Sequence, residues 1–227
     1  VGTNNGNGLI LFNGTGTFSG NTITANTGFG IFIDSSAANQ INNNIVGTNA
    51  LGGISISNST GSLIENTVTQ NQGVGIFLNS ASGNTLSGNT VSENSGQGIS
   101  DSAGTGNQIS NNTIGANTLG GISVSTGSAT IDGNIVSGNL SFGISLVSSN
   151  SNIISENEIS ENTSEGIIIN GNSNNVSNNS IFNNGAPGVF IASGNNNSIL
   201  SNSIYNNTSL GIELAAGVND SQVYPPI

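Results

Sequence analysis

Apolar residues recur along this chain in short alternating runs that return every 22 or 23 residues. Residues 166–184 show the unit clearly: a glycine and an isoleucine run are followed by two segments of the form Asn-x-Val or Asn-x-Ile and a closing asparagine. One inward apolar residue between polar neighbours is the period of a β-strand, and the runs are too short and too β-branched for helices. Each unit therefore predicts three short strands separated by three corners.

Stacked units place the apolar residues in three columns, one for each strand. The first column follows the opening glycine of every unit, from Leu9 to Ile212. One coil cannot bury its apolar face alone, but coils stacked at about 4.8 Å form parallel sheets around a continuous core. The sequence predicts one all-β domain over residues 1–227, a parallel β-solenoid of about ten coils of 22–23 residues with three strands each. Residues 1–7 form a partial coil and residues 215–227 a closing tail.

Asparagine occupies two corners of nearly every unit. Stacked asparagines can pass side-chain amide hydrogen bonds along the axis, as in cross-β stacks, so both columns are predicted to form structural ladders. Glycine and asparagine are also expected to supply the positive φ angles of the corners. One column contains Asn21, Asn44, Asn66, Asn89, Asn112, Asn134, Asn157, Asn179 and Asn202, and the other contains Asn4, Asn26, Asn49, Asn71, Asn94, Asn117, Asn139, Asn162, Asn184 and Asn207. A third column, Asn39, Asn84, Asn107, Asn152, Asn174 and Asn197, is interrupted by Gly16, Gly61 and Ala129.

These units, written Gly-Ile-x-Ile followed by Asn-x-Ile-x-x-Asn-x-Ile-x-x-Asn, resemble the right-handed parallel β-helix repeat family with its pectin-lyase-like fold. The resemblance covers Asn4 to Leu214 and implies a right-handed solenoid. The fold hosts lyases, hydrolases, epimerases, adhesins and structural rods, so it does not define an activity. The tail from Leu210 to Ile227 resembles the closing segment of secreted bacterial β-helix surface proteins, which implies an extracellular or cell-surface location.

The composition excludes several partners. The chain has no Lys, Arg or His and eleven acidic residues, giving a formal charge of −11. Such a charge argues against nucleic acid and anionic membranes as partners. The chain has no cysteine, and no apolar run approaches transmembrane length, so neither disulfides nor membrane insertion is predicted.

The same composition predicts that the chain is not an enzyme and has no cofactor. Lyases of the resembled family use a basic residue as proton acceptor, and hydrolases of the polygalacturonase type pair Asp with His, Arg or Lys; all these partners are missing here. A glycosidase built from carboxylates alone needs two acids about 5–10 Å apart across a cleft. Glu93 with Asp101, or Glu156 with Glu158, are the pairs on offer, but nothing else in the sequence marks a cleft.

Some acidic residues depart from the repeat. Asp101 stands where other coils carry Ile33, Ile56 or Leu78, and an inward carboxylate is costly, so a local bulge is expected to turn it towards solvent. The alternative is a functional acid with a raised pKa. Glu156, Glu158, Glu161 and Glu165 form an acidic edge of one coil. They are expected to be a solvated face, with a Ca²⁺ site as the alternative, although their spacing matches no calcium-loop motif.

Both ends of the chain lie within coils. Open solenoid ends are sheet edges, so either the chain is part of a longer protein or its ends stack head-to-tail on further copies of itself. The residues expected at such assembly ends are Val1, Asn4, Ile212, Leu214, Tyr224 and Ile227. Among many Asn-x-Ser/Thr sequons, Asn13, Asn58 and Asn196 lie in loops where a glycosylating host can modify them.

The sequence thus predicts a non-enzymatic extracellular structural protein that assembles head-to-tail into a filament or sheath. The alternative is a rod-like adhesin that binds carbohydrate or Ca²⁺ along one face.

Overall fold

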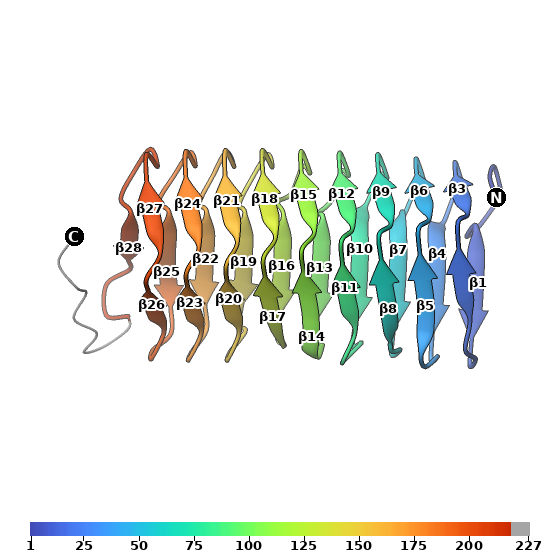
Figure 1. The fold of residues 1–227 in the computed structure, drawn as a ribbon, viewed down its shortest axis with the longest axis horizontal. Coiled ribbons are helices and arrows are strands. Elements are labelled where there is room, and N and C mark those ends of the chain that lie inside the picture. The colour runs from blue at the N-terminus through green and yellow to red at the C-terminus, as the bar shows by residue number, and fades with distance from the viewer. Residues whose placement is uncertain (219–227) are drawn as a thin grey trace.

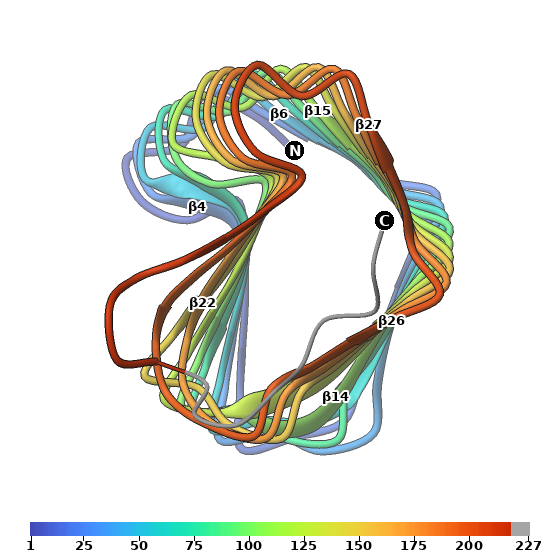
Figure 2. The same ribbon diagram turned by 90° about the vertical axis from the view of Figure 1, so that its left-hand side faces the viewer.

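Three parallel sheets surround one continuous core in the computed structural model, which describes residues 1–218 (Figure 1). Each of the first nine coils gives one strand to each sheet, the last gives β28 to the first sheet alone, and strands pair in parallel with their counterparts in the next coil. Viewed along the axis, the coils lie over one another with a gradual rotation (Figure 2). The predicted three-stranded parallel β-solenoid is confirmed.

The strands follow the repeat. The first sheet contains β1 (Leu9–Phe12), β4 (Phe29–Asp34), β7 (Gly52–Ser57), β10 (Val74–Asn79), β13 (Ile99–Ser102), β16 (Ile122–Ser125), β19 (Ile144–Val147), β22 (Ile167–Asn170), β25 (Val189–Ser193) and β28 (Ile212–Leu214). The second sheet contains β2 (Thr17–Ser19), β5 (Asn39–Asn42), β8 (Gly61–Ile64), β11 (Thr85–Ser87), β14 (Thr105–Ser110), β17 (Ser128–Asp132), β20 (Ile153–Ser155), β23 (Asn175–Ser177) and β26 (Ser198–Leu200). The third sheet contains β3 (Thr22–Thr24), β6 (Ile45–Gly47), β9 (Thr67–Thr69), β12 (Thr90–Ser92), β15 (Thr113–Gly115), β18 (Ile135–Ser137), β21 (Glu158–Ser160), β24 (Ser180–Phe182) and β27 (Ser203–Tyr205).

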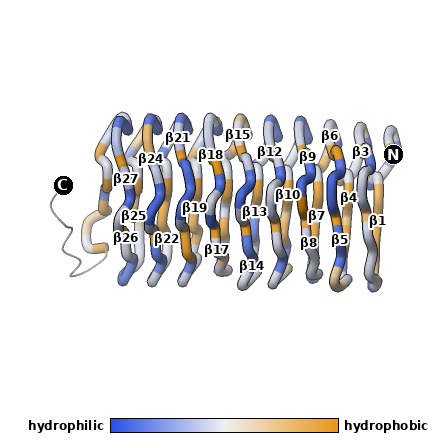
Figure 3. The backbone as a smooth tube through the Cα atoms, viewed as in Figure 1, coloured by the Kyte–Doolittle hydropathy of each residue, from blue (hydrophilic) through white to orange (hydrophobic). Residues whose placement is uncertain are grey.

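The core consists of stacked apolar columns in register. Ile76 on β10 lies beside Ile54 on one side and Ile99 on the other, and all three side chains are fully buried. The alternation of apolar and polar residues is visible along the strands (Figure 3). Burying one such side chain contributes about 1.5–3 kcal/mol, and each coil repeats the contribution. The apolar period therefore holds the coils in register, because a slip by one residue would turn the apolar columns outward.

Asparagine ladders close two of the three corners. At the corner between the second and third sheets, the backbone N–H and Nδ2 of Asn89 both donate to Asn112 Oδ1 at 2.9 Å. Asn112 donates in the same way to Asn134 Oδ1 at 2.9 Å. The ladder between the third and first sheets repeats this arrangement, as in Asn94 to Asn117. Both ladders run in one direction: each coil donates to the amide oxygen of the coil that follows it.

Residues other than glycine and asparagine also adopt positive φ at the corners, contrary to the expectation from sequence. The residue before each ladder asparagine is left-handed, and it is Glu65, Glu93 or Ala25 in some coils, with φ of 55°, 56° and 57°. This conformation costs roughly 1–2 kcal/mol for such residues. The paired hydrogen bonds of the following asparagine offset that cost, so the corner tolerates almost any side chain there.

Candidate functional site

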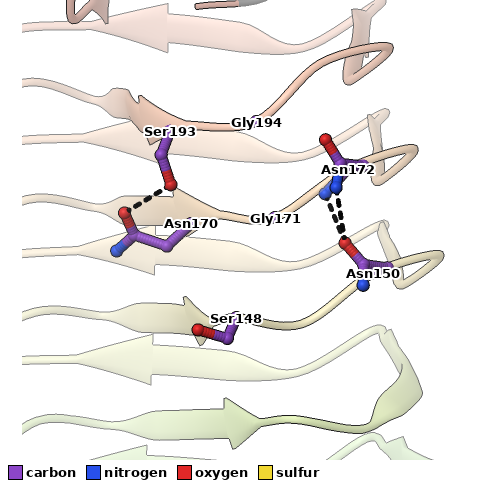
Figure 4. Close-up of a pocket in the computed structure, with 7 residues that line it drawn as sticks. All are labelled: Ser148, Asn150, Asn170, Gly171, Asn172, Ser193 and Gly194. Atoms are coloured by element: carbon purple, nitrogen blue, oxygen red, sulfur yellow. Dashed lines mark hydrogen bonds between the residues drawn. The ribbon is translucent and has the colours of Figure 1, made fainter.

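The turns of three successive coils meet at the corner between the first and second sheets and enclose an open indentation of about 370 Å³. We call it the corner groove, and its lining residues are Ser148, Asn150, Asn170, Gly171, Asn172, Ser193 and Gly194 (Figure 4). All seven are amide-bearing, hydroxyl-bearing or glycine, and none carries a charge. The corner groove therefore offers neutral hydrogen-bond donors and acceptors and no ionic contact.

Hydrogen bonds fix the amide side chains of the corner groove. Asn150 Oδ1 accepts from the backbone N–H of Asn172 at 2.6 Å and from Asn172 Nδ2 at 3.2 Å. Asn170 Oδ1 accepts from Ser193 Oγ at 3.1 Å (Figure 4). These bonds occupy the amide oxygens. The Nδ2 groups of Asn150 and Asn170 make no hydrogen bond to other protein groups within residues 1–218. A ligand would meet two oriented donors.

Two glycines allow the turns to approach closely enough to form the corner groove. Gly171 has φ of +157°, and a Cβ there would lie 1.9 Å from the carbonyl oxygen of Ser149. Gly194 has φ of +102°, and a Cβ there would lie 1.9 Å from the carbonyl oxygen of Gly171. Any other residue would push these turns apart.

Sequence reasoning missed the corner groove because it followed the inward columns. The signal was an outward asparagine column at the same spacing, Asn150, Asn172 and Asn195. In the structure it is a short outer ladder, in which the backbone N–H of Asn195 donates to Asn172 Oδ1 at 2.8 Å. It runs opposite to the inner ladders, because each coil donates to the coil before it.

The four glutamates of the predicted acidic edge are not gathered into one cluster. Glu158 lies on β21, Glu156 and Glu161 occupy left-handed corners on either side of it, and Glu165 bonds with the hydroxyl of Ser164. Within residues 1–218 no group of three or more acidic, histidine or cysteine side chains is placed to hold a metal ion. In the other candidate pair, Glu93 is exposed and accepts from Gln70 Nε2 at 2.9 Å, whereas Asp101 is buried.

The prediction that Asp101 turns out to solvent is wrong. Asp101 pairs in register with Leu78 and Val124, points into the core and has 0% exposed surface. Asn107 Nδ2 donates to Asp101 Oδ2 at 2.8 Å, while Oδ1 has no partner within residues 1–218. Burial raises the pKa of this carboxyl above its ordinary value of 3.8, and the hydrogen bond from Asn107 and the nearby backbone of Gly104, which makes no hydrogen bond of normal geometry to Oδ1, lower it by less. The strand keeps its register because small residues at the adjacent corner make room for the carboxyl.

Four of the six residues predicted at assembly ends, Val1, Asn4, Ile212 and Leu214, lie in the outermost described coils. The Val1 amino group donates to the Thr22 carbonyl at 2.6 Å, and Asn4 Nδ2 donates to Asn26 Oδ1 at 2.7 Å. Ile212 and Leu214 lie on β28, which pairs with β25. Tyr224 and Ile227 lie outside the described residues.

The three predicted glycosylation asparagines, Asn13, Asn58 and Asn196, are exposed and left-handed, with φ of 51°, 45° and 58°. Asn58 Nδ2 donates to Asp34 Oδ1 at 3.1 Å, and this bond would have to break before a glycan could be attached. Modification at these sites stays a prediction.

The fold defines a right-handed parallel β-helix protein with an uncharged corner groove. The chain belongs to the right-handed β-helix family, since the model described as "Right handed beta helix region" matches residues 74–224. A second model, described as "Periplasmic copper-binding protein (NosD)", matches residues 1–129. No curated protein matches the sequence. None of the described segments is a helix of the length and hydrophobicity that a membrane span requires.

Solved structures share the fold at low sequence identity. The A-module of mannuronan C-5 epimerase AlgE6 from Azotobacter vinelandii is 16% identical with a TM-score of 0.71, over 93% of this chain and 65% of that one. DFA-IIIase from Arthrobacter chlorophenolicus A6 is 12% identical with a TM-score of 0.68, over 86% of this chain and 54% of that one. The Dettilon tailspike protein is 15% identical with a TM-score of 0.68, over 88% of this chain and 48% of that one. The chain thus spans between about half and two thirds of the length of these proteins.

The prediction that the chain is not an enzyme is contradicted by these comparisons. Two of the three structures named, the epimerase module and DFA-IIIase, are enzymes built on the same fold. The prediction rested on the missing Lys, Arg and His, and their absence excludes only mechanisms that need a basic side chain. Carboxylates alone can serve as acid, base and nucleophile, so the composition does not exclude catalysis.

Proposed function

We propose that this protein binds a neutral polysaccharide through the corner groove. The observation that carries the proposal is the lining of the groove, where amides, hydroxyls and glycines from three coils form an uncharged site with two oriented Nδ2 donors. Sugar hydroxyls both donate and accept, which is the complement that asparagine and serine provide. The turns repeat along the axis at about 4.8 Å, a step comparable with the advance of one sugar ring along an extended glycan.

The charge of the chain defines the class of glycan. With eleven acidic residues and no Lys, Arg or His, the protein would repel an anionic polymer and has no cation to pair with its acidic groups. The fold neighbours include proteins whose names refer to mannuronan and alginate. We carry over from them only the idea of a polysaccharide ligand. A location outside the cytoplasm, as the periplasmic family model suggests, would give access to such a polymer.

Copper, which the second family model names, does not fit the residues of this chain. Protein ligands for copper are chiefly imidazole, thiolate and thioether groups. The chain contains no His, Cys or Met. No step of the proposed function therefore involves copper.

Replacing Asn170 with alanine is expected to weaken neutral glycan binding about five- to tenfold, the loss of roughly one hydrogen bond. Affinity gel electrophoresis in dextran, β-1,3-glucan and galactomannan would measure it, with alginate as the anionic comparison. The matched control is Asn79→Ala, because Asn79 holds the same register position on β10 four coils away. Retardation by alginate alone, or equal effects of the two variants, would contradict the proposal. Released oligosaccharides in the same incubations would report catalysis.

Head-to-tail assembly is a second candidate, supported by the direction of the inner ladders. One face of a coil presents Oδ1 acceptors and the other presents N–H donors, as Asn4 and Asn26 illustrate. Two copies stacked with the same polarity would continue the ladders, whereas opposed copies would place donors against donors. This proposal assigns Val1 and Asn4 to one contact face and Ile212 and Leu214 to the other.

The assembly proposal predicts fibres of constant width when the protein is concentrated, with no ligand added. Negative-stain imaging and sedimentation velocity would detect them, and parallel samples with EDTA would show whether a divalent cation on the acidic groups contributes. Discrete rods at every concentration would exclude assembly through these faces.

A further inference from the structure

The third asparagine column, at the corner of the first and second sheets, is interrupted where the corner turn is one residue short. Asn107 follows Ser102 by five positions, whereas Ala129 follows the equivalent Ser125 by four. The pairing of β14 with β17 shifts register between Thr105 and Asn107, at the same corner. In the next coil alanine holds the place where a ladder asparagine would accept from Asn107.

Asp101 takes the hydrogen bond that the missing asparagine would accept. Asn84 donates its backbone N–H and Nδ2 to Asn107 Oδ1 at 2.8 and 3.2 Å. Asn107 Nδ2 in turn donates to Asp101 Oδ2 at 2.8 Å and to the Ala81 carbonyl at 2.8 Å. This chain of donors ends on the carboxyl group, and the ladder starts again where the backbone N–H of Ala129 donates to Asn152 Oδ1 at 2.8 Å.

The other interruption within the rod is satisfied without an acid. At Gly61 the corner is also one residue short, and Asn39 Nδ2 donates instead to the backbone carbonyl of Thr60 at 3.1 Å. The inward residue in the coil of Asn39 is Ile33, at the position equivalent to Asp101. A short corner therefore does not require a carboxyl, and Asp101 is a distinct solution.

Small residues make the space that Asp101 occupies. A Cβ on Gly104 would lie 2.4 Å from Asp101 Oδ1 and 2.4 Å from Asn107 Nδ2. The same turn position is Ala81 in the preceding coil and Gly127 in the following one. The strand keeps its register around Asp101, and the small residues of the corner leave space for its carboxyl. The surrounding structure therefore supports the burial of this acid.

We propose that Asp101 substitutes for the ladder asparagine missing at position 129. We further propose that ionisation of Asp101 weakens the contact between the coil that contains β13 and the coil that contains β16. The neutral carboxyl ends the donor chain inside the core. Once ionised, it leaves a charged oxygen, Oδ1, without a partner in an apolar surround, which is costly unless the coils part and admit water.

The direction of the pH dependence follows from the environment of the carboxyl. Leu78 and Val124 flank Asp101 on the adjacent strands, and Ala81, Gly104 and Asn107 face it from the corner, so no charged group compensates it. Because burial raises the pKa in the folded state, the native protein holds a proton that the unfolded chain has lost. The stability that the Asp101 carboxyl contributes is therefore complete below about pH 4 and is lost as pH rises through the pKa of the folded state.

Urea denaturation between pH 4 and pH 9 tests the proposal with Asp101→Asn, which keeps an acceptor but cannot ionise. The wild-type midpoint is expected to fall with rising pH more steeply than that of Asp101→Asn. Asp132→Asn, which removes an acid from the outer face of β17, is the control and should keep the wild-type slope. Hydrogen exchange at the Ser128 N–H, which donates to the Gly104 carbonyl at 3.0 Å, should reveal the opening in wild type alone. If the urea midpoint of Asp101→Asn fell with pH as steeply as that of the wild type, the proposed pH-sensitive contact between the coils would be overturned.

A second variant tests the ladder role. Asp101→Leu resembles the Leu78 position and cannot ionise, but it removes the acceptor of Asn107. At pH 5 it should melt about 5 °C below Asp101→Asn, because one buried N–H loses its partner. Equal melting temperatures of the two variants would overturn the substitution for a ladder residue, whatever the pH profile shows.

Discussion

Replacing Asn112 with alanine is expected to lower the free energy of unfolding by about 4 kcal/mol. The backbone N–H and Nδ2 of Asn89 both donate to Asn112 Oδ1 at 2.9 Å, and the variant leaves both buried donors unpaired. Asn112 Nδ2 also donates to the carbonyls of Leu86 and Ser110, each at 3.0 Å. Urea denaturation at pH 7 would measure the change, with hydrogen exchange locating the damage near the coils of β11 and β14.

The matched control for Asn112→Ala is Asn175→Ala. Asn175 is an exposed asparagine on β23 outside the ladders, and its replacement should change stability by less than about 0.5 kcal/mol. Equal losses of stability in the two variants would show that the ladder hydrogen bonds of Asn112 contribute no more to stability than an exposed strand asparagine does.

Replacing Gly121 with alanine is expected to cost about 3 kcal/mol or more, because the added methyl group has no space. A Cβ at this opening glycine would lie 2.4 Å from Val136 Cγ1 and 2.5 Å from the Gly143 carbonyl oxygen. To relieve either contact, the backbone at Gly121 would have to move away from its neighbours, which would disturb its packing on the next coil. Thermal denaturation monitored by circular dichroism would show the loss as a lower melting temperature.

Gly138→Asn is the control for Gly121→Ala. Gly138 has φ of +67° and open space around its Cα, and the same corner position carries Asn183 at φ 56° in a later coil. This substitution should be almost neutral. A destabilisation as large as that of Gly121→Ala would mean that glycine entropy, rather than close packing, explains the opening column.

The fold was predictable because one rule repeats. Nearly every coil places isoleucine, valine or leucine at the same inward positions, so the period of the pattern determines strands, corners and register together, as with Ile54, Ile76 and Ile99. The ladder hydrogen bonds also follow from a repeated residue in a repeated place. The same pattern is present in coil after coil, so single residues that break it do not obscure the fold.

The corner groove and Asp101 were not predictable for the opposite reason. Whether Asp101 points inward depends on Gly104 and on the short corner at Ala129, which belong to two other segments of the chain. The groove depends on how the turns at Gly171 and Gly194 approach each other, which no periodic column reports. Both features arise where neighbouring coils differ in turn length or residue type. An interpretation based on the shared repeat does not take such differences into account.

The one-way inner ladders make the rod an electrical dipole. Peptide dipoles alternate along a strand and nearly cancel in a sheet, but the side-chain amides of Asn89, Asn112 and Asn134 all point the same way. As in an α-helix, aligned N–H groups place the positive pole at the end towards which they point, here the later coils. Against the repulsion between chains of charge −11, this dipole would favour antiparallel rods side by side and aligned rods end to end, and it would help to orient dilute rods in an applied electric field.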